Sequence, residues 1–172
     1  MNATTIQGRT WVFGDDINTD LIQPSSVVML PIAEQVPRVF EANRPGWAEQ
    51  VQQGDIIIAG RNFGLGSSRP ASKVLAALGI AAVVAESING LFYRNCVNFG
   101  LPALSCPGVL AAVNEREEVV VDLAAGTLEN IETGIVVQGR AWAEQLLTIL
   151  SGGGLIESLE RDGRLLTNTT RS

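Results

Sequence analysis

The chain has 172 residues, of which 46% are hydrophobic and 17% are charged. This composition excludes intrinsic disorder over most of the length, because the apolar content suffices for a buried core. Lys and Arg number 12 against 18 Asp and Glu, which gives a net charge of -6. A protein that neutralises nucleic-acid phosphates needs the opposite balance, so we do not expect DNA or RNA binding. No apolar run reaches the roughly 18 residues of a membrane-spanning helix.

The sequence contains no histidine and only two cysteines, Cys96 and Cys106. The absence of histidine excludes Ser-His-Asp triads, Cys-His pairs and HExxH zinc sites. Any catalysis must therefore use carboxylates, hydroxyls, arginines or groups of a partner. The cysteines are too few for a disulfide framework, and we expect both to be structural thiols. Residues 1–7 lack the regions of a signal peptide, so a cytoplasmic protein is expected.

The first half of the chain alternates apolar runs with loops. Residues 10–13 predict a strand that ends at Gly14, and the Asp- and Asn-rich residues 15–20 predict a loop. Prolines make residues 30–50 a loosely helical or irregular segment. The β-branched run at 55–59 predicts a strand that is buried on both faces.

The second half continues this alternation and then changes to short strands. The predicted elements are a helix at 71–78 closed by Gly79, a strand at 81–85, a helix at 91–97 closed by Gly100, a strand at 101–105, a hairpin of 118–123 and 127–131, a strand at 135–137 and a helix at 141–150. Residues 162–172 are expected to be a flexible tail. The order of elements predicts a three-layer α/β fold with a mixed sheet, formed by residues 1–172 as a single domain.

The segment most informative about function is residues 60–70, GRNFGLGSSRP. It leaves a predicted strand and opens a predicted helix, so its N–H groups and the helix dipole suit an anion. Pro70 is expected at the first helical position, with Ser68 or Arg69 as the cap. Arg69 suits a carboxylate, and Ser67 or Ser68 suits hydrogen bonding or proton exchange. The alternative, which spacing alone favours, is a glycine-rich turn with a serine cap and a surface arginine.

Other motifs in the chain are incomplete. The loop lacks the third glycine of a dinucleotide-binding fingerprint, the GK[ST] of a P-loop and the GxSxG of a nucleophile elbow. The spacing of Asp16, Asn18 and Asp20 resembles the start of an EF-hand loop, but Leu21 and Val27 replace its glycine and glutamate. We therefore expect an Asx-rich turn rather than a calcium site.

Several segments resemble the small subunits of isopropylmalate isomerase (3-isopropylmalate dehydratase) and homoaconitase. They are GDDINTDLIQP at 14–24, NFGLGSSR at 62–69, AAVVAES at 81–87, LFYRN at 91–95, NFGLP at 98–102 and GGGLI at 152–156. Their order and spacing match the family from about residue 13 to residue 108. These subunits are the detached swivel domain of the aconitase superfamily, so the resemblance implies a three-layer swivelling β/β/α domain with a mixed sheet.

The resemblance implies a hydro-lyase that reversibly dehydrates and isomerises a 2-hydroxy dicarboxylic acid, as in leucine biosynthesis. By position, Ser67 is similar to the residue whose alkoxide removes the proton α to a carboxylate, and Arg69 to the arginine that stabilises that alkoxide or binds a carboxylate. Ser68 and the backbone at Gly66 would assist in binding the substrate. Serine is a weak base near neutral pH, so it needs this cationic neighbour and the loop amides.

The resemblance also implies a partner. A large subunit would hold a [4Fe-4S] cluster, which agrees with the lack of a three-cysteine cluster site and of any other metal site here. This chain would be inactive alone and active as a heterodimer or heterotetramer. The apolar excess also allows the isolated subunit to self-associate.

Two positions depart from the family's pattern. Pro70 stands where the family usually has glutamate, and Leu65 stands where cysteine is common. Loss of the glutamate favours an alternative function, a non-catalytic swivel-domain partner or regulatory subunit. Retention of Ser67 and Arg69 favours the enzyme, because a scaffold needs neither residue.

The substrate is predicted from residues 25–30, which in the family reach toward the variable substituent. Here they read SSVVML and offer no arginine to a third carboxylate. This favours 3-isopropylmalate or a dimethylmalate-like acid over homoaconitate, unless Arg38 or Arg44 folds back into the site. The side chains predicted to contact the alkyl group are those of Val27, Val28 and Met29.

Overall fold

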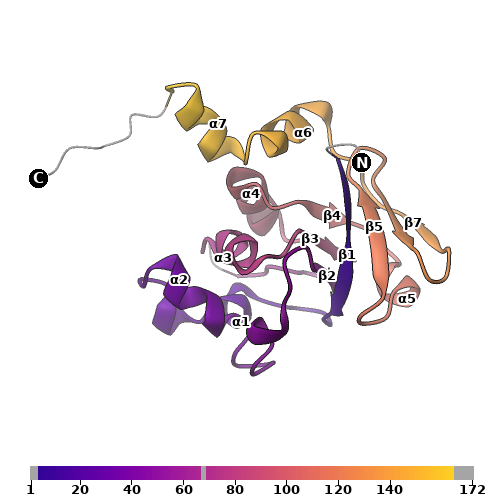
Figure 1. Cartoon of the computed structure of the whole chain (residues 1–172), viewed down its shortest axis with the longest axis horizontal. Coiled ribbons are helices and arrows are strands. Elements are labelled where there is room, and N and C mark those ends of the chain that lie inside the picture. The colour runs from indigo at the N-terminus through magenta and orange to yellow at the C-terminus, as the bar shows by residue number, and fades with distance from the viewer. Residues whose placement is uncertain (1–3, 67–68, 165–172) are drawn as a thin grey trace, which may run out of the picture.

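A seven-stranded mixed sheet forms the centre of the computed structural model, which describes residues 4–66 and 69–164 (Figure 1). Its strands are β1 (Thr5–Val12), β2 (Ile56–Ala59), β3 (Ala82–Ala85), β4 (Ala103–Ser105), β5 (Glu118–Asp122), β6 (Thr127–Asn130) and β7 (Val136–Gln138). The strand order is β4-β3-β2-β1-β5-β6-β7, with β1 to β4 parallel and β1, β5, β6 and β7 antiparallel. The predicted α/β class and mixed sheet are confirmed.

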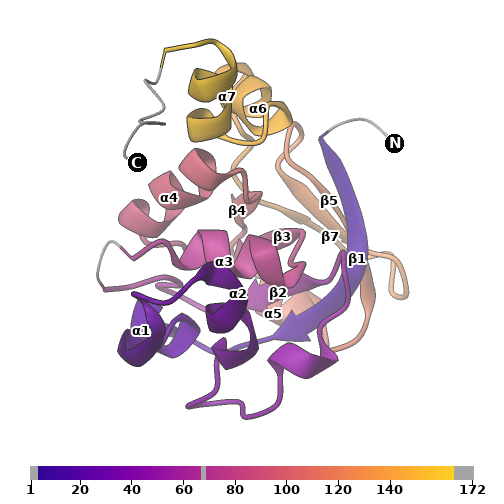
Figure 2. The same cartoon turned by 60° about the vertical axis from the view of Figure 1, so that its left-hand side comes forward.

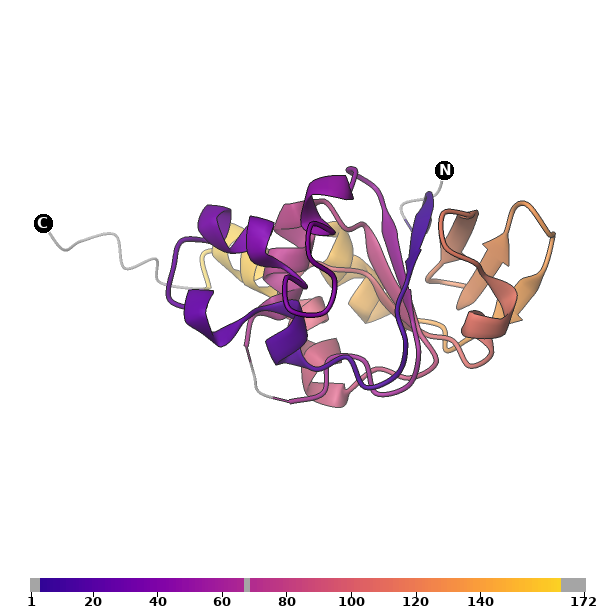
Figure 3. The same cartoon turned by 90° about the horizontal axis from the view of Figure 1, so that it is seen from below.

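The helices gather mainly on one side of the parallel strands. They are α1 (Thr19–Ile22), α2 (Ile32–Gln35), α3 (Ala71–Leu78), α4 (Gly90–Phe99), α5 (Val109–Ala112), α6 (Glu144–Ser151) and α7 (Leu155–Arg161), with the 3-10 turns η1 (Ser25–Val27), η2 (Val36–Arg38) and η3 (Ala48–Gln50). Seen from below, α1 to α4 and the β5–β7 strands lie on opposite sides of β1 (Figure 3). In the described residues, no helix has the length and apolarity required to cross a bilayer.

The parallel half of the sheet confirms the predictions made from apolar runs. Every residue of β2 and β3 is buried. These strands are covered on both faces, because α5 also packs against them. The two predicted glycine caps are confirmed too: Gly79 ends α3 with φ 111° and Gly100 ends α4 with φ 70°.

The antiparallel half begins earlier in the chain than predicted. β1 starts at Thr5 rather than Thr10, because its first half pairs with β5 and its second half pairs with β2. Of residues 5–9 only Ile6 is a large apolar residue and none is buried, so no apolar run marks them. The hairpin of β5 and β6 is confirmed, and Asp122 closes its turn by accepting from the N–H groups of Ala124 and Ala125.

The C-terminal helices also differ from the predictions. α6 starts at Glu144 rather than at residue 141, because Trp142 is held outside the helix. Its backbone N–H donates to Leu123 O at 2.9 Å and its indole Nε1 donates to Ala103 O at 2.7 Å. α7 was not predicted; it follows the triple glycine and packs against α4 (Figure 2). Of the predicted tail at 162–172, only 162–164 are described, and they close α7.

The irregular segment at 30–50 is anchored by aromatic packing. Phe40 stacks on Phe13 with ring centroids 4.4 Å apart, and Trp47 packs edge-on against Phe13, Phe40 and Trp11. All four rings are buried. This cluster fixes the segment against β1 and the residue that follows it.

Candidate functional site

The 60–66 loop is clamped between the loops that follow β1 and β3. On one side, Gly64 N donates to Ile17 O at 2.7 Å and Thr19 N donates to Leu65 O at 2.8 Å. On the other side, Phe63 N donates to Ser87 O at 3.1 Å and Asn89 N donates to Phe63 O at 2.8 Å. All three loops leave the carboxyl ends of parallel strands, the edge at which open α/β sheets bind ligands.

Side chains reinforce this clamp. Arg61 forms a salt bridge with Asp15 at 2.8 Å, and the hydrogen bond from Arg61 holds the pKa of Asp15 below its ordinary value. The Asn62 amide donates to Asp16 Oδ1 at 2.9 Å. Asn18 caps α1 by accepting from Leu21 N at 2.9 Å, so the predicted Asx-rich turn is confirmed.

Glycine is required at two positions of the loop. Gly64 has φ 78°, and a Cβ there would lie 2.2 Å from Cγ of Phe92. Gly66 has φ 118°, and its Cβ would lie 3.0 Å from Oγ1 of Thr19. The loop can therefore approach α4 and α1 only because these residues lack side chains.

Gly64→Ala is expected to destabilise the protein by about 3 kcal/mol, because it adds a clash with Phe92 to an unfavourable φ. Urea unfolding of the variant would measure this loss. Gly14→Ala is the matched control, since a Cβ at Gly14 meets nothing within 4 Å. Equal stability of the two variants would contradict the close approach of the loop to α4.

Arg69, at the end of this loop, is held by groups from two helices. Its Nη1 pairs with the carboxylate of Asp20 in α1 and donates to Gln23 O at 3.1 Å. Asn95 of α4 donates to the Arg69 carbonyl at 3.3 Å. The arginine side chain is 22% exposed, so the guanidinium is fixed and yet reachable. Sequence reasoning missed Asp20, Gln23 and Asn95 as supports of Arg69, although all three lie in the segments that carry the resemblance.

The structure describes the residues on either side of the serine pair. Ser67 and Ser68 lie outside the described residues, whereas Gly66 and Arg69 on either side are placed. The prediction that Pro70 occupies the first helical position is wrong. Pro70 lies one residue earlier, at the cap position of α3. Its carbonyl accepts from Lys73 N at 2.9 Å and from Val74 N at 3.3 Å, so the helix begins one residue later.

The three residues predicted to contact the alkyl group of the substrate differ in exposure. Val27 is buried at 1% exposure, Val28 is half-buried, and Met29 is 93% exposed. Residues 25–30, the Met29 segment, are held by Gln35, whose side-chain amide donates to Leu30 O at 2.6 Å and to Val28 O at 3.3 Å. Met29 is thus the member that a ligand or partner can reach.

The Met29 segment is linked to Arg69 through Gln23. The Gln23 side chain donates to Oε1 of Gln35, while the Gln23 backbone carbonyl accepts from Arg69. Both glutamine side chains are buried. A shift of the Met29 segment would therefore displace the Arg69 guanidinium.

Arg38 and Arg44 are both engaged away from the Met29 segment. Arg44 pairs with Glu115, donates to Val12 O at 3.3 Å and lies over the Trp11 ring. The hydrogen bond from Arg44 lowers the pKa of Glu115. Arg38 pairs with Glu41 three residues on. Neither cation joins residues 25–30, so the condition for a homoaconitase-type site is not met by them.

The two cysteines are free and buried, as predicted for structural thiols. Burial raises the pKa of Cys106 to about 11, and it raises the pKa of Cys96 as well. Both groups are therefore neutral thiols near pH 7.

We expect both thiols to react with Ellman's reagent at pH 8 about 100-fold more slowly in the native protein than in urea. The thiolate is the nucleophile, and a raised pKa reduces its fraction. The contribution of these thiols to stability should be constant below about pH 8 and should fall as the pH rises through 9 toward 11, because the thiols ionise first in the unfolded chain. A thiol that reacts at once in native protein would contradict this placement.

Comparison with known proteins agrees with this geometry. Residues 19–108 match the aconitase C-terminal domain family. The chain is 42% identical over 160 residues to the 3-isopropylmalate dehydratase small subunit 1 of Methanopyrus kandleri, covering 92% of this chain and 94% of that protein. It is 40% identical over 153 residues to the methanogen homoaconitase small subunit of Methanothermobacter thermautotrophicus, covering 88% of each.

A solved structure supports the same relationship. The crystal structure of 3-isopropylmalate dehydratase from Methanocaldococcus jannaschii superimposes with a TM-score of 0.84 at 30% identity, over 92% of this chain and 95% of that one. The chain therefore belongs to the aconitase C-terminal domain family and, within it, to the family of 3-isopropylmalate dehydratase and homoaconitase small subunits.

Proposed function

We propose that this chain is the small subunit of a two-subunit hydro-lyase that dehydrates and isomerises a 2-hydroxy dicarboxylic acid, most of all 3-isopropylmalate. One observation carries the proposal. Arg69 is fixed by Asp20 and Gln23 directly after the serine pair, at the edge of the parallel sheet. A guanidinium that is held yet reachable suits a substrate carboxylate or a developing oxyanion.

In this proposal the chemistry of the chain is proton removal. The Ser67 alkoxide takes the proton from the carbon α to a carboxylate, and that electron pair forms the new C=C bond as the hydroxyl leaves. Arg69 stabilises the alkoxide or binds the carboxylate. Ser68 and the Gly66 backbone complete the anion site. Departure of the hydroxyl is assigned to groups of the large subunit.

The residues described here do not fit an iron-sulfur cluster. Cys96 and Cys106 are buried with raised pKa values, whereas cluster ligands are thiolates. No group of three His, Cys, Asp or Glu side chains that suits a metal ion occurs in the described parts of the chain. The [4Fe-4S] cluster of the proposed enzyme would therefore have its ligands on the large subunit.

Assembly and location belong to the same proposal. The chain folds as one swivel-like domain, and it joins a large subunit as a heterodimer or heterotetramer. Two free, buried cysteines are typical of proteins in reducing compartments, which supports a cytoplasmic enzyme.

The substrate class is inferred from the Met29 segment. Met29 presents an apolar side chain to the outside, and Arg38 and Arg44 are paired elsewhere. A third carboxylate of a tricarboxylic acid would find no cation on this segment. Relatives named for either substrate are about equally similar to the chain, so the proposed preference for 3-isopropylmalate rests on the Met29 segment.

We expect the reconstituted complex to have a kcat/KM for 3-isopropylmalate about 100-fold above that for homoaconitate. Met29→Arg should raise the value for homoaconitate, because it supplies the missing cation. Met29→Leu is the matched control and should keep the preference. A wild-type complex that prefers homoaconitate would contradict the assigned substrate class.

A non-catalytic swivel domain is the second candidate. Pro70 favours it, because it caps α3 without a side-chain hydrogen bond at the position where the family's glutamate is usual. The Ser67 variant described in the Discussion separates the two functions.

A further inference from the structure

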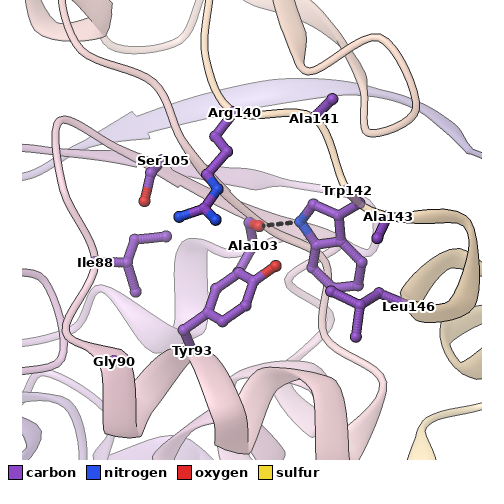
Figure 4. Close-up of a pocket in the computed structure, with 10 residues that line it drawn as sticks. All are labelled: Ile88, Gly90, Tyr93, Ala103, Ser105, Arg140, Ala141, Trp142, Ala143 and Leu146. Atoms are coloured by element: carbon purple, nitrogen blue, oxygen red, sulfur yellow. Dashed lines mark hydrogen bonds between the residues drawn. The ribbon is translucent and has the colours of Figure 1, made fainter.

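A pocket of about 340 Å³ lies between α4, the end of β4 and the start of α6 (Figure 4). Its apolar wall includes the Trp142 ring, Ile88 and Leu146. Trp142 is fixed by its hydrogen bond to Ala103 O and by edge-on packing against Tyr93, with centroids 5.6 Å apart. The wall is therefore formed before any ligand arrives.

Three polar side chains point into this pocket: Arg140, Tyr93 and Ser105 (Figure 4). Among the described residues, the Arg140 guanidinium, the Tyr93 hydroxyl and the Ser105 hydroxyl form no hydrogen bond or salt bridge with the protein. Arg140 is held in place by its backbone, whose N–H donates to Ser105 O at 3.0 Å. Few, convergent, unpartnered polar groups in an apolar pocket are typical of a small-molecule site.

Arg140 gives the pocket a positive charge, because no acidic residue is among the described residues that line it. Glu86, the acidic residue that follows β3, instead accepts from the backbone N–H groups of Gly108 at 2.7 Å and Leu110 at 2.9 Å. Burial raises the pKa of Tyr93, and the nearby Arg140 cation opposes that rise, which places the two groups in electrostatic contact. The pocket also includes Gly90, at the positive end of the ten-residue helix α4.

We propose that this pocket binds a small carboxylate with a branched or aromatic apolar body. The carboxylate pairs with Arg140 and accepts from the Tyr93 and Ser105 hydroxyls, while the apolar body packs on Trp142, Ile88 and Leu146. Arginine suits a carboxylate because its fork of donors matches the two oxygens.

This site goes beyond the proposed reaction. None of its lining residues belongs to the 60–70 loop or to the Met29 segment. Asn95 reaches Arg69 from α4, whereas Tyr93, two residues earlier, lines the pocket on another side of the same helix. Binding here can therefore be tested without any measurement of activity.

The test is a titration of the full chain, labelled with 15N, with 4-methylpentanoate. The chain has three tryptophans, and Trp142→Phe assigns the indole N–H signal of Trp142. We expect a saturable shift of that signal with a Kd of about 1 mM. The neutral amide of the same acid should not bind, because it lacks the negative charge that pairs with Arg140. Inorganic phosphate should bind more weakly, because it lacks the apolar body.

Arg140→Gln should weaken binding of 4-methylpentanoate at least about tenfold. Arg38→Gln, which removes the same charge from an exposed pair with Glu41, should leave it unchanged. The proposal is overturned if the Trp142 signal does not shift, if Arg140→Gln binds equally well, or if phosphate binds as tightly as the acid. It is also overturned if the signal shifts only on addition of the large subunit, since the pocket would then be a protein contact.

Discussion

Ser67→Ala is expected to lower kcat of the reconstituted enzyme by about 10³-fold, because it removes the general base. The proton α to the carboxylate should also stop exchanging with deuterium from the solvent. That exchange reports proton removal directly and is not sensitive to how well the two subunits associate. Assembly with the large subunit, followed by gel filtration, should be unchanged.

Ser72→Ala is the matched control for Ser67. Ser72 lies in α3 just after the loop, and its hydroxyl is buried without a hydrogen-bond partner in the described structure. Its removal costs no hydrogen bond, so activity and stability should stay near those of the wild type. If Ser67→Ala kept full activity, the chain would be a scaffold and the non-catalytic function would be correct.

Arg69→Lys is expected to lower kcat/KM by about 100-fold, even though it keeps the charge. A lysine cannot reproduce the fork that pairs with Asp20, donates to Gln23 O and still faces the site. If Arg69 binds a substrate carboxylate, the loss appears mainly in KM; if it stabilises the Ser67 alkoxide, the loss appears mainly in kcat. Steady-state kinetics with the same substrate separates these roles.

Two further variants test the interpretation of Arg69. Arg38→Lys changes an exposed pair and should have no effect on either constant. Asp20→Asn keeps the guanidinium but weakens its support, so its effect should be smaller than that of Arg69→Lys. Wild-type kinetics in Arg69→Lys would show that the guanidinium only supports the loop.

The sequence was a good guide where one local signal decides the structure. The buried runs at 56–58 and 82–85 and the glycine caps at Gly79 and Gly100 are set by apolar content and backbone conformation alone. β1 was half missed because its first residues depend on β5, whose pairing residues lie more than 100 positions away. The start of α6 was missed because Trp142 bonds to β4 instead of continuing the helix.

The candidate site was predictable in part for the same reason. The residues of the loop could be identified from the resemblance, but not what holds them. The partner of Arg44, Glu115, is 71 residues away in sequence, so only the fold could place that arginine away from the Met29 segment. The cap at Pro70 depends on the path of the loop, which is set by clamping from both sides.

The most direct test of the account is to purify the tagged chain from its own cells under anaerobic conditions, record its absorbance spectrum, and assay hydration and dehydration of 3-isopropylmalate. We predict a brown complex with a larger, cluster-bearing subunit that is active, and no activity in the isolated chain. A colourless homo-oligomer from cells that express no such partner would contradict the account.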